Sequence, residues 1–514
     1  MESADLSPRR RWAHVGVAVL GGVLQSLAQG FSYWPLAFVC FLPMFWLQEA
    51  EPKARTQRIL ALGLVHGTVC FTGGYYWLVA MLENFSGYEG LPNWGFASVF
   101  FVYQGVQQML LYWLYARARR RGAPVALAAV GSLMAVEWLF PALFPSFLAT
   151  SLHNLPIFLQ VVDLGGPMLL SAVMMAANAA LFEAYRVRHG APQARRTWGV
   201  AAFGLVFTLA YGAYRVAEVD ARAADAETVH VGMVQVNMGI FEKREDPFEG
   251  HRRHLQQSRQ LLARGDLDLL VWPESAYTYF LREGTPDVRR TVLSSPDFPE
   301  PLEAPTLFGG LSRRRVQGEG RSYNTAFLTN ARGEIVGTYD KTYLLAFGEY
   351  LPLGDVFPIL YEWSPNTGRF TPGDHVRALA HGSMRITTLV CYEDVLPAFT
   401  RRAVAENTPN LLANITNDAW FGDTREPWIH LALAKFRAVE HHRALVRATN
   451  SGVSAFVDPV GRTLDTIAVG ERDQLVAELP LLDENTVYTS LGDWPAYLGA
   501  PLIAFLAFRR RRDA

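Results

Sequence analysis

Met384-Arg-Ile-Thr-Thr-Leu-Val-Cys-Tyr-Glu-Asp394 is the stretch that decides how the second half of this chain folds. It is rich in β-branched and apolar residues up to Val390, which predicts a buried strand, and a polar cluster follows immediately. Functional residues in open sheets lie beyond the carboxyl ends of strands, so Cys391 is the first candidate for a reactive side chain. Because a lone cysteine is more often a small buried apolar residue, its neighbours must be considered with it.

Two other predicted strands end in the same way. Leu267-Asp-Leu-Leu-Val-Trp-Pro-Glu-Ser275 ends on Glu274, and Glu334-Ile-Val-Gly-Thr-Tyr-Asp-Lys341 ends on Lys341. A thiol is a weak nucleophile until a base or a cation favours the thiolate. Glu274 can accept the thiol proton if burial raises its pKa, and Lys341 supplies positive charge for a developing oxyanion. Alone, Lys341 could be a surface lysine and Trp272-Pro273 a strand terminator, but the combination favours nucleophilic catalysis.

The sequences around these three residues resemble the nitrilase superfamily. The matching motifs are Val271-Trp-Pro-Glu-Ser275, Tyr339-Asp-Lys341 with Gly348-Glu-Tyr-Leu-Pro352, and Val390-Cys-Tyr-Glu393. Together with the apolar segments on either side, they resemble the apolipoprotein N-acyltransferase family within that superfamily. This resemblance implies an α/β domain of the nitrilase type, an α-β-β-α sandwich over residues 229–481. It also implies that Glu274, Lys341 and Cys391 are the catalytic residues.

The resemblance assigns supporting roles to other residues. Glu349 matches a second family glutamate that holds the lysine or assists proton transfer. Tyr392 and Glu393 match positions that flank the nucleophile and shape the site. Trp420 and Phe421, within Asn414-Ile-Thr-Asn-Asp-Ala-Trp-Phe-Gly422, match a loop that contributes to an acyl-chain pocket and a mobile lid.

Two departures from the family pattern concern the pocket and not the catalytic residues. Glu440-His-His-Arg443 has a histidine pair where Asn-Gly is expected. Phe241 is the first aromatic residue after Gln235-Val-Asn237, where the family often has tryptophan. Since His441 and His442 have no set of carboxylates to complete a metal site, we expect no metal and no cofactor.

Composition indicates a membrane part joined to a soluble part. The chain has 514 residues, of which 50% are hydrophobic and only 18% are charged, below the roughly 25% of a soluble domain. The formal net charge of -1 argues against nucleic acid as a partner. Cys40 and Cys70 lie in apolar segments, so the soluble part has a single thiol, Cys391, and forms no internal disulfide.

The apolar segments predict a helical membrane domain of about eight spans, because one span needs about 20 residues. Two spans are expected within residues 12–48, and the others at 59–82, 94–116, 124–143, 157–182, 198–214 and 494–508. Glu137, His66 and Asp163 lie in these segments and are expected to pair inside the helix bundle.

Basic clusters predict the orientation of these spans. The clusters at 9–11, 53–58, 117–121, 186–196 and 509–512 fall on one side, which indicates that both termini are cytoplasmic. We therefore predict about seven spans in residues 1–220 and an extracytoplasmic catalytic domain in residues 221–485, opened by a charged linker at 221–227. Residues 486–514 are expected to form a last span and a basic cytoplasmic tail.

These observations favour an acyltransferase in which Cys391 forms a thioester with an acyl chain. The family implies phosphatidylethanolamine as the usual phospholipid donor and, as acceptor, the α-amine of the diacylglyceryl-cysteine at the N-terminus of an apolipoprotein. It also implies the bacterial inner membrane, with the catalytic domain on the periplasmic side, and we expect a monomer. The alternatives are a membrane-tethered nitrilase-type amidase and a non-catalytic lipoprotein-binding membrane protein.

Overall fold

The computed structural model describes residues 7–86, 90–192, 195–239, 242, 245–282, 284–364 and 366–509. Phe241, residues 510–514 of the predicted tail, and Tyr88, an aromatic residue that the sequence predicts near an outer membrane boundary, lie outside the described residues. By packing, the described parts of 1–79, 90–215 and 491–514 form one compact unit, and those of 80–89 and 216–490 form a second. The sequence-based division, by contrast, places residues 80–89 in the membrane part at 1–220.

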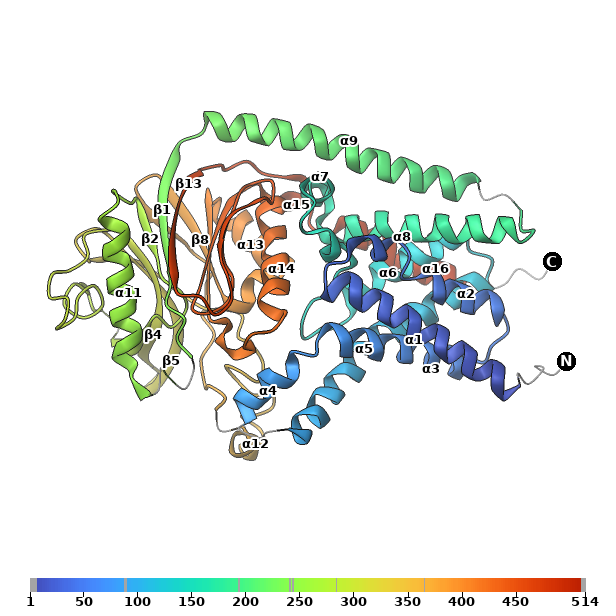
Figure 1. Ribbon diagram of the computed structural model, residues 1–514, viewed down its shortest axis with the longest axis horizontal. Coiled ribbons are helices and arrows are strands. Elements are labelled where there is room, and N and C mark those ends of the chain that lie inside the picture. The colour runs from blue at the N-terminus through green and yellow to red at the C-terminus, as the bar shows by residue number, and fades with distance from the viewer. Residues whose placement is uncertain are drawn as a thin grey trace. The chain divides into compact units, whose positions relative to one another are not determined.

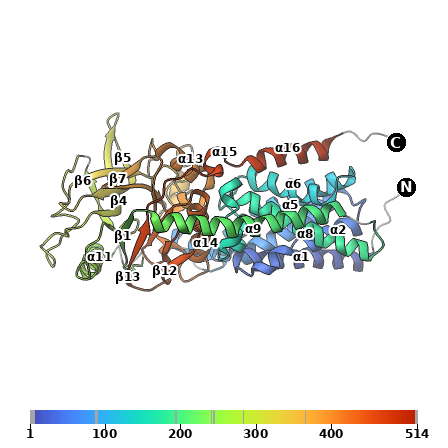
Figure 2. The ribbon, with the colours of Figure 1, turned by 90° about the horizontal axis from the view of Figure 1, so that it is seen from above.

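The first unit is helical. Its helices are α1 (Pro8–Gly30), α2 (Leu42–Ala50), α3 (Thr56–Gly74), α5 (Leu91–Arg120), α6 (Val125–Leu139), α7 (Pro156–Leu159), α8 (Val162–Arg188), most of α9 (Arg195–Asp225) and α16 (Trp494–Phe508). Helix α3 packs against α1 and α5, and α16 packs against α6 and α5, as Figure 2 shows for α16 and α6. Helix α4 (Leu78–Ser86) follows α3.

Two described helices, α8 and α9, are long and apolar enough to cross a membrane. Helix α3 and the first part of α4 form a third candidate span, bent by 62°, while α6 and α16 are apolar but shorter. The number of spans, about eight, therefore stays a prediction. Asp163 accepts a hydrogen bond from the Tyr211 hydroxyl at 2.9 Å. Glu137 accepts one from the Ser171 hydroxyl at 3.1 Å, so both buried carboxyls have partners in the helix bundle.

Most of the charged linker predicted at residues 221–227 is helical. Helix α9 continues to Asp225, and only the last two of those residues precede β1 (Thr228–Gln235). The sequence Ala221-Arg-Ala-Ala-Asp225 consists mostly of strong helix formers, and charge alone does not end a helix.

The second unit contains two sheets. One has the order β13-β1-β2-β4-β5-β6, with β3 paired to β4, and the other has the order β12-β11-β10-β9-β8-β7. The strands are β2 (Leu269–Val271), β3 (Tyr277–Arg282), β4 (Thr306–Val316), β5 (Glu319–Thr329), β6 (Ile335–Asp340), β7 (Ala378–His381), β8 (Met384–Val390), β9 (Leu411–Thr416), β10 (Ala444–Thr449), β11 (Ser454–Val457), β12 (Thr463–Ile467) and β13 (Asp473–Pro480).

The two sheets pack face to face around one apolar core. Val231 and Val271 of the first sheet and Ile386 and Leu389 of the second belong to the same buried cluster. Helix α11 (Pro247–Leu262) covers the outer face of the first sheet, and α13 (Pro397–Asn407) and α14 (Glu426–His441) cover that of the second (Figure 1). This confirms the predicted α-β-β-α arrangement. The short helices α12 (Ile359–Trp363) and α15 (Val487–Leu491) complete the unit.

The sequence predicts a helix over residues 429–445, but the observed helix ends earlier. Helix α14 stops at His441, His442 adopts a left-handed conformation with φ of 48°, and β10 begins at Ala444. Strand β10 is buried along its whole length. Because a strand buried on both faces shows no alternation of apolar and polar residues, its sequence extends the apolar pattern of the helix before it.

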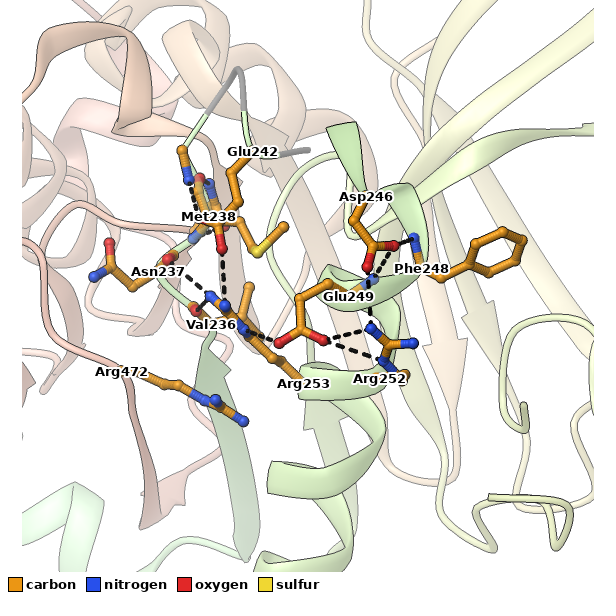
Figure 3. A network of polar contacts seen from close by, with 12 residues as sticks. Val236, Asn237, Met238, Glu242, Asp246, Phe248, Glu249, Arg252, Arg253 and Arg472 are labelled. Carbon is orange, nitrogen blue, oxygen red and sulfur yellow. Dashed lines mark hydrogen bonds and ion pairs between the residues drawn. The ribbon is translucent and has the colours of Figure 1, made fainter. Parts of the chain in front are cut away.

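A network of polar contacts holds the connection between β1 and α11, as Figure 3 shows. Asp246 caps α11 by accepting hydrogen bonds from the backbone N–H groups of Phe248 and Glu249. Arg253 donates to the Glu249 carboxylate at 2.7 Å and to the carbonyl oxygen of Asn237 at 3.3 Å. These contacts fix the chain just beyond β1.

Candidate active site

Three of the residues singled out in the sequence lie beyond strand ends and are buried together. Lys341 follows β6 directly, Cys391 follows β8 directly, and Glu274 lies three residues beyond β2. Their exposed fractions are 1% for Lys341, 8% for Cys391 and 6% for Glu274. Cys391 has a φ of 52°, a left-handed conformation that is rare for a residue with a side chain. Such strained backbone is typical of a sharp turn that presents a functional side chain.

Lys341 forms ion pairs with two glutamates. Its Nζ lies 2.7 Å from Glu349 Oε2 and 3.7 Å from Glu274 Oε1. The side-chain amide of Asn324, on β5, donates to Glu274 Oε1 at 2.7 Å and to Glu349 Oε1 at 2.8 Å. The two carboxylates are therefore held on either side of one ammonium group. We call Glu274, Lys341, Glu349 and Cys391 the reactive cluster.

Burial and charge set the protonation of the reactive cluster. Burial raises the pKa of Glu274, the charge of Lys341 opposes this, and the charge of Glu349 adds to it. Burial favours the neutral amine of Lys341, but the charges of Glu349, Cys391 and Glu274 outweigh burial and raise its pKa. Burial also raises the pKa of the Cys391 thiol well above its usual value. The cluster at rest thus holds a neutral thiol beside an ammonium group and a carboxylate of raised basicity.

Glu393 joins the turn after β8 to the turn after β6. Its Oε2 accepts a hydrogen bond from the backbone N–H of Val390 at 2.8 Å. Its Oε1 accepts from the backbone N–H groups of Thr342 and Tyr343 at 2.8 and 3.0 Å, and from the Tyr339 hydroxyl at 2.7 Å. With a fully buried carboxylate, Glu393 fixes the relative position of the lysine and cysteine turns. Tyr392, the other flanking residue, is also buried.

A second buried group of charges, which sequence reasoning missed, lies immediately beyond the cysteine. Arg447 on β10 donates to Asp394 and Asp418 at 2.9 Å each. His430 on α14 lies between the same two carboxylates, with Nε2 2.7 Å from Asp394 and Nδ1 3.2 Å from Asp418. We call Asp394, Asp418, His430 and Arg447 the ionic network.

The charges of the ionic network balance. Burial and the nearby Arg447 lower the pKa of His430, but Asp394 and Asp418 outweigh them and raise it to about 10. Burial opposes ionisation of Asp418, yet Arg447 and His430 lower the pKa of that carboxyl. Two carboxylates thus face two cations.

Asp418, Glu426 and His430 have the spacing of a possible metal site, although the sequence predicts no metal. Asp418 already accepts hydrogen bonds from Arg447 and His430. Burial and the charge of Asp418 raise the pKa of Glu426 to about 8, which favours its neutral form. The Arg447 guanidinium and the His430 imidazolium therefore already bind the Asp418 carboxylate that a metal ion would need. The arrangement fits an ion-pair network better than a metal site.

Thr416, the last residue of β9, touches both groups of charges. A hydrogen bond from its side chain favours the Cys391 thiolate. The same hydroxyl donates to Asp418 Oδ1 at 3.2 Å. Because a hydroxyl has one hydrogen, Thr416 can serve only one of these acceptors at a time.

The predicted lid residues lie beside this region. Phe421 is buried and Trp420 is half-buried, on a short 3-10 helix (Asp418–Phe421). The side chain of Asn84, on α4, donates to the carbonyl oxygen of Trp420 at 2.8 Å. The carbonyl oxygen of Asn84 in turn accepts from the Asn366 side chain at 3.4 Å. One residue of the segment 80–89 thus joins the Trp420 loop to the loop that contains Asn366.

Gly309 on β4 makes room for the turn that carries Glu274. A side chain there would place its first carbon 2.6 Å from Glu274 Cα and 2.8 Å from the backbone nitrogen of Ser275. Any larger residue would displace the backbone of Glu274.

Comparison with known proteins is consistent with these features. Residues 21–180 match the apolipoprotein N-acyltransferase N-terminal domain, and residues 230–485 match the carbon-nitrogen hydrolase family. An apolipoprotein N-acyltransferase from Geobacter metallireducens is 30% identical, over 99% of this chain and 98% of that one. One from Azotobacter vinelandii is 31% identical, over 98% of this chain and 97% of that one.

A solved structure was also found to be similar to part of the chain. It is an amidase of the nitrilase superfamily from Nesterenkonia AN1, with 21% identity, coverage of 49% of this chain and 90% of that one, and a TM-score of 0.34. The two relatives, by contrast, match essentially the whole length of the chain. The chain belongs to the apolipoprotein N-acyltransferase family.

Proposed function

We propose that this protein transfers an acyl chain from a phospholipid to the α-amine of the diacylglyceryl-cysteine at the N-terminus of an apolipoprotein, through a thioester on Cys391. The observation that carries the proposal is the reactive cluster, in which a buried thiol lies with an ammonium group and two carboxylates. The cluster lies within the residues that match the carbon-nitrogen hydrolase family. The donor we propose is phosphatidylethanolamine, and the site lies on the periplasmic side of a bacterial inner membrane.

In the first step, the Cys391 sulfur attacks the ester carbonyl carbon of the donor while Glu274 accepts the thiol proton. Lys341 stabilises the negative charge on the carbonyl oxygen, and the backbone N–H of Tyr392 is a second candidate donor. The ester C–O bond then breaks, and Glu274 returns the proton to the departing oxygen. The products of this step are a lysophospholipid and the acyl thioester.

In the second step, the amine of the acceptor attacks the thioester carbonyl. Glu274 accepts a proton from the nitrogen, the C–S bond breaks, and the proton returns to the sulfur of Cys391. The raised pKa of Glu274 suits a group that accepts and donates a proton in both steps. The pairing with Glu349 keeps Lys341 charged throughout.

An exposed apolar segment beside the reactive cluster supports a lipid substrate. The segment lies between Lys341 and α12 and includes Glu349. Five of its large apolar side chains, and Ile359 at the start of α12, are exposed to solvent; the five are Tyr343, Phe347, Leu353, Val356 and Phe357. A soluble amidase has no need of such a surface, whereas an enzyme that takes its donor from a bilayer does.

The test is the intact mass of the purified protein after incubation with phosphatidylethanolamine. We expect an adduct of one acyl chain on the wild type that hydroxylamine removes and that a diacylated lipopeptide discharges with formation of an N-acyl product. Cys391→Ala is the control and should remain unmodified. An adduct discharged by water as fast as by the lipopeptide would indicate an amidase. The absence of an adduct on folded protein would favour a non-catalytic binding protein.

A further inference from the structure

The first unit contains a basic cavity that neither the reaction nor the family resemblance uses. Its volume is about 250 Å³, and it is lined by Thr56, Ile59, Trp113, Arg117, Arg120 and Arg121. Three of these six residues are arginines and none is acidic. The basic clusters predict that this end of the helices faces the cytoplasm. We call this cavity the arginine pocket.

Other arginines at this end of the unit have carboxylate partners. Arg58 pairs with Glu51 at 2.8 Å, Arg119 with Glu49 at 3.0 Å, and Arg186 with Glu183 at 2.9 Å. These pairs neutralise charge locally, so positive charge in this region does not by itself imply a ligand.

The arginines of the pocket differ, because none pairs with a carboxylate among the residues that the structure describes. The guanidinium of Arg117 lies over the rings of Trp113 and Phe508, 5.9 and 4.5 Å from their centres. The Nε of Arg117 is buried without a hydrogen-bond acceptor. Arg120 donates to the carbonyl oxygens of Pro52 and Ala54, which carry no full charge. Three like charges thus gather without a counter-ion from the described chain, an arrangement that an anion would stabilise.

The start of α3 adds to the positive potential. Thr56, the first residue of this 19-residue helix, lines the pocket, and the preceding residue, Arg55, makes no side-chain capping bond. The first N–H groups of a helix carry partial positive charge and bind anions, phosphate above all.

One wall of the pocket is apolar and continues along α16. Ile59 and Trp113 line the pocket, and Phe508 lies against Arg117. Leu498, Leu502 and Phe505 are exposed on α16 at helical spacing and lead toward Phe508. Figure 2 shows α16 running lengthwise beside α6. A phosphate in the pocket would therefore have acyl-chain contacts available on the same helix.

We propose that the arginine pocket binds the phosphate of an anionic phospholipid, with its acyl chains along the exposed face of α16. Basic pockets between membrane helices commonly take such headgroups. Since no carboxylate lines the pocket to pair with an ammonium group, it should prefer phosphatidylglycerol to phosphatidylethanolamine. The site is separate in sequence and in chemistry from the reactive cluster, and its ligand is not the proposed acyl donor.

The test is native mass spectrometry of the full-length protein in detergent, with phosphatidylglycerol and phosphatidylethanolamine of identical acyl chains. We expect the wild type to retain phosphatidylglycerol about tenfold better, because both lipids offer the same phosphate but the three arginines repel the ammonium group of phosphatidylethanolamine. Arg117→Gln with Arg121→Gln should remove this preference. Arg120 stays unchanged because it holds the carbonyl groups at 52 and 54. Arg10→Gln with Arg188→Gln, on two exposed arginines of α1 and α8, removes the same charge as a matched control and should leave retention unchanged.

Other outcomes overturn the proposal. Equal retention of the two lipids by the wild type would contradict the proposal. Unchanged retention of phosphatidylglycerol by the folded double variant would also contradict it. If inorganic phosphate displaces phosphatidylglycerol at equal concentration, the ligand is a soluble phosphate and the lipid assignment is wrong. If the double variant does not fold, Arg117→Lys with Arg121→Lys preserves the charge and should keep the preference, and its loss would contradict the phosphate contact.

Discussion

The reactive cluster and the ionic network are two groups of charges that adjoin in the chain, since Cys391 of one and Asp394 of the other are three residues apart, and they are built on opposite principles. In the ionic network two carboxylates face two cations, and each aspartate contacts both Arg447 and His430. In the reactive cluster two carboxylates share one ammonium group. Burial is similar in both, so the difference lies in the pairing.

This difference separates a group that holds a structure from one that can react. A balanced network gains most of its interaction energy in the folded state and has no reason to change protonation. An unbalanced cluster keeps one carboxylate whose pKa is raised, and that carboxylate is ready to accept a proton. The comparison predicts that substitutions in one group mainly change rate and in the other mainly change stability.

Glu274→Gln should give the largest effect, on rate. The amide keeps the shape of the side chain but accepts no proton, so formation of the thioester should slow by about 10²–10⁴-fold. Thermal denaturation should change little, since a neutral group replaces a carboxyl that burial already disfavours as an anion. The appearance of acyl-enzyme followed by mass measures the rate. An unchanged rate would show that a group other than Glu274 accepts the thiol proton.

Arg447→Met should act mainly on stability. It leaves Asp394 and Asp418 buried with His430 as the one cation that contacts both among the described residues, and loss of one member of a buried ion pair costs about 3–5 kcal/mol. Thermal denaturation would record this loss. Adding Asp418→Asn to this variant should recover part of the stability, because one unpaired charge is removed. A melting temperature equal to that of the wild type would show that the network is not structural.

Glu349→Gln should shift the pH dependence of the reaction. The active form of Glu274 is the carboxylate, so kcat/KM should fall as pH drops through its raised pKa. The charge of Glu349 contributes to that raised value, and its removal also frees Lys341 to approach Glu274. Both effects lower the pKa of Glu274, so the acid limb of the profile should move to lower pH. A shift to higher pH would contradict the assigned arrangement.

Thr416→Val should give the smallest effect and should touch both groups. Loss of one hydrogen bond is expected to lower stability by about 1 kcal/mol. It should also slow alkylation of Cys391 by iodoacetamide, because the thiolate loses a donor. Thr388→Val is the matched control, since Thr388 is a buried threonine on β8 whose hydroxyl makes no hydrogen bond. Equal effects of the two substitutions on stability and on alkylation would show that the Thr416 hydroxyl has no specific role in either group of charges.

The sequence predicted the reactive cluster better than the ionic network, for a physical reason. Glu274, Lys341 and Cys391 each end an apolar run, and a polar residue at the end of a buried strand stands out. Asn324, His430 and Arg447 lie within β5, α14 and β10 and acquire meaning only from partners far along the chain. No local pattern distinguishes a buried arginine that is paired from one on a surface.

The strands show the same limit. Nine runs of β-branched and apolar residues predict strands, and they correspond to β1, β2, β4, β5, β6, β8, β9, β11 and β13, whereas β3, β7, β10 and β12 were missed. Strand β12 has four exposed residues out of five, and β7 is a four-residue strand at the edge of its sheet, so neither carries a clear apolar face. The two sheets and their helical covers could therefore be predicted, but not their full extent.

The contact between Asn84 and Trp420 has a consequence for the order in which the molecule is assembled. The two residues are 336 positions apart in the sequence. At a synthesis rate of about 5–20 residues per second, Asn84 leaves the ribosome roughly 20–70 s before its partner exists. During that interval the segment at 80–89 has no catalytic unit to join. The loop around Trp420 can reach its final position only after nearly the whole chain has been made, so closure of this region belongs to the last steps of biogenesis.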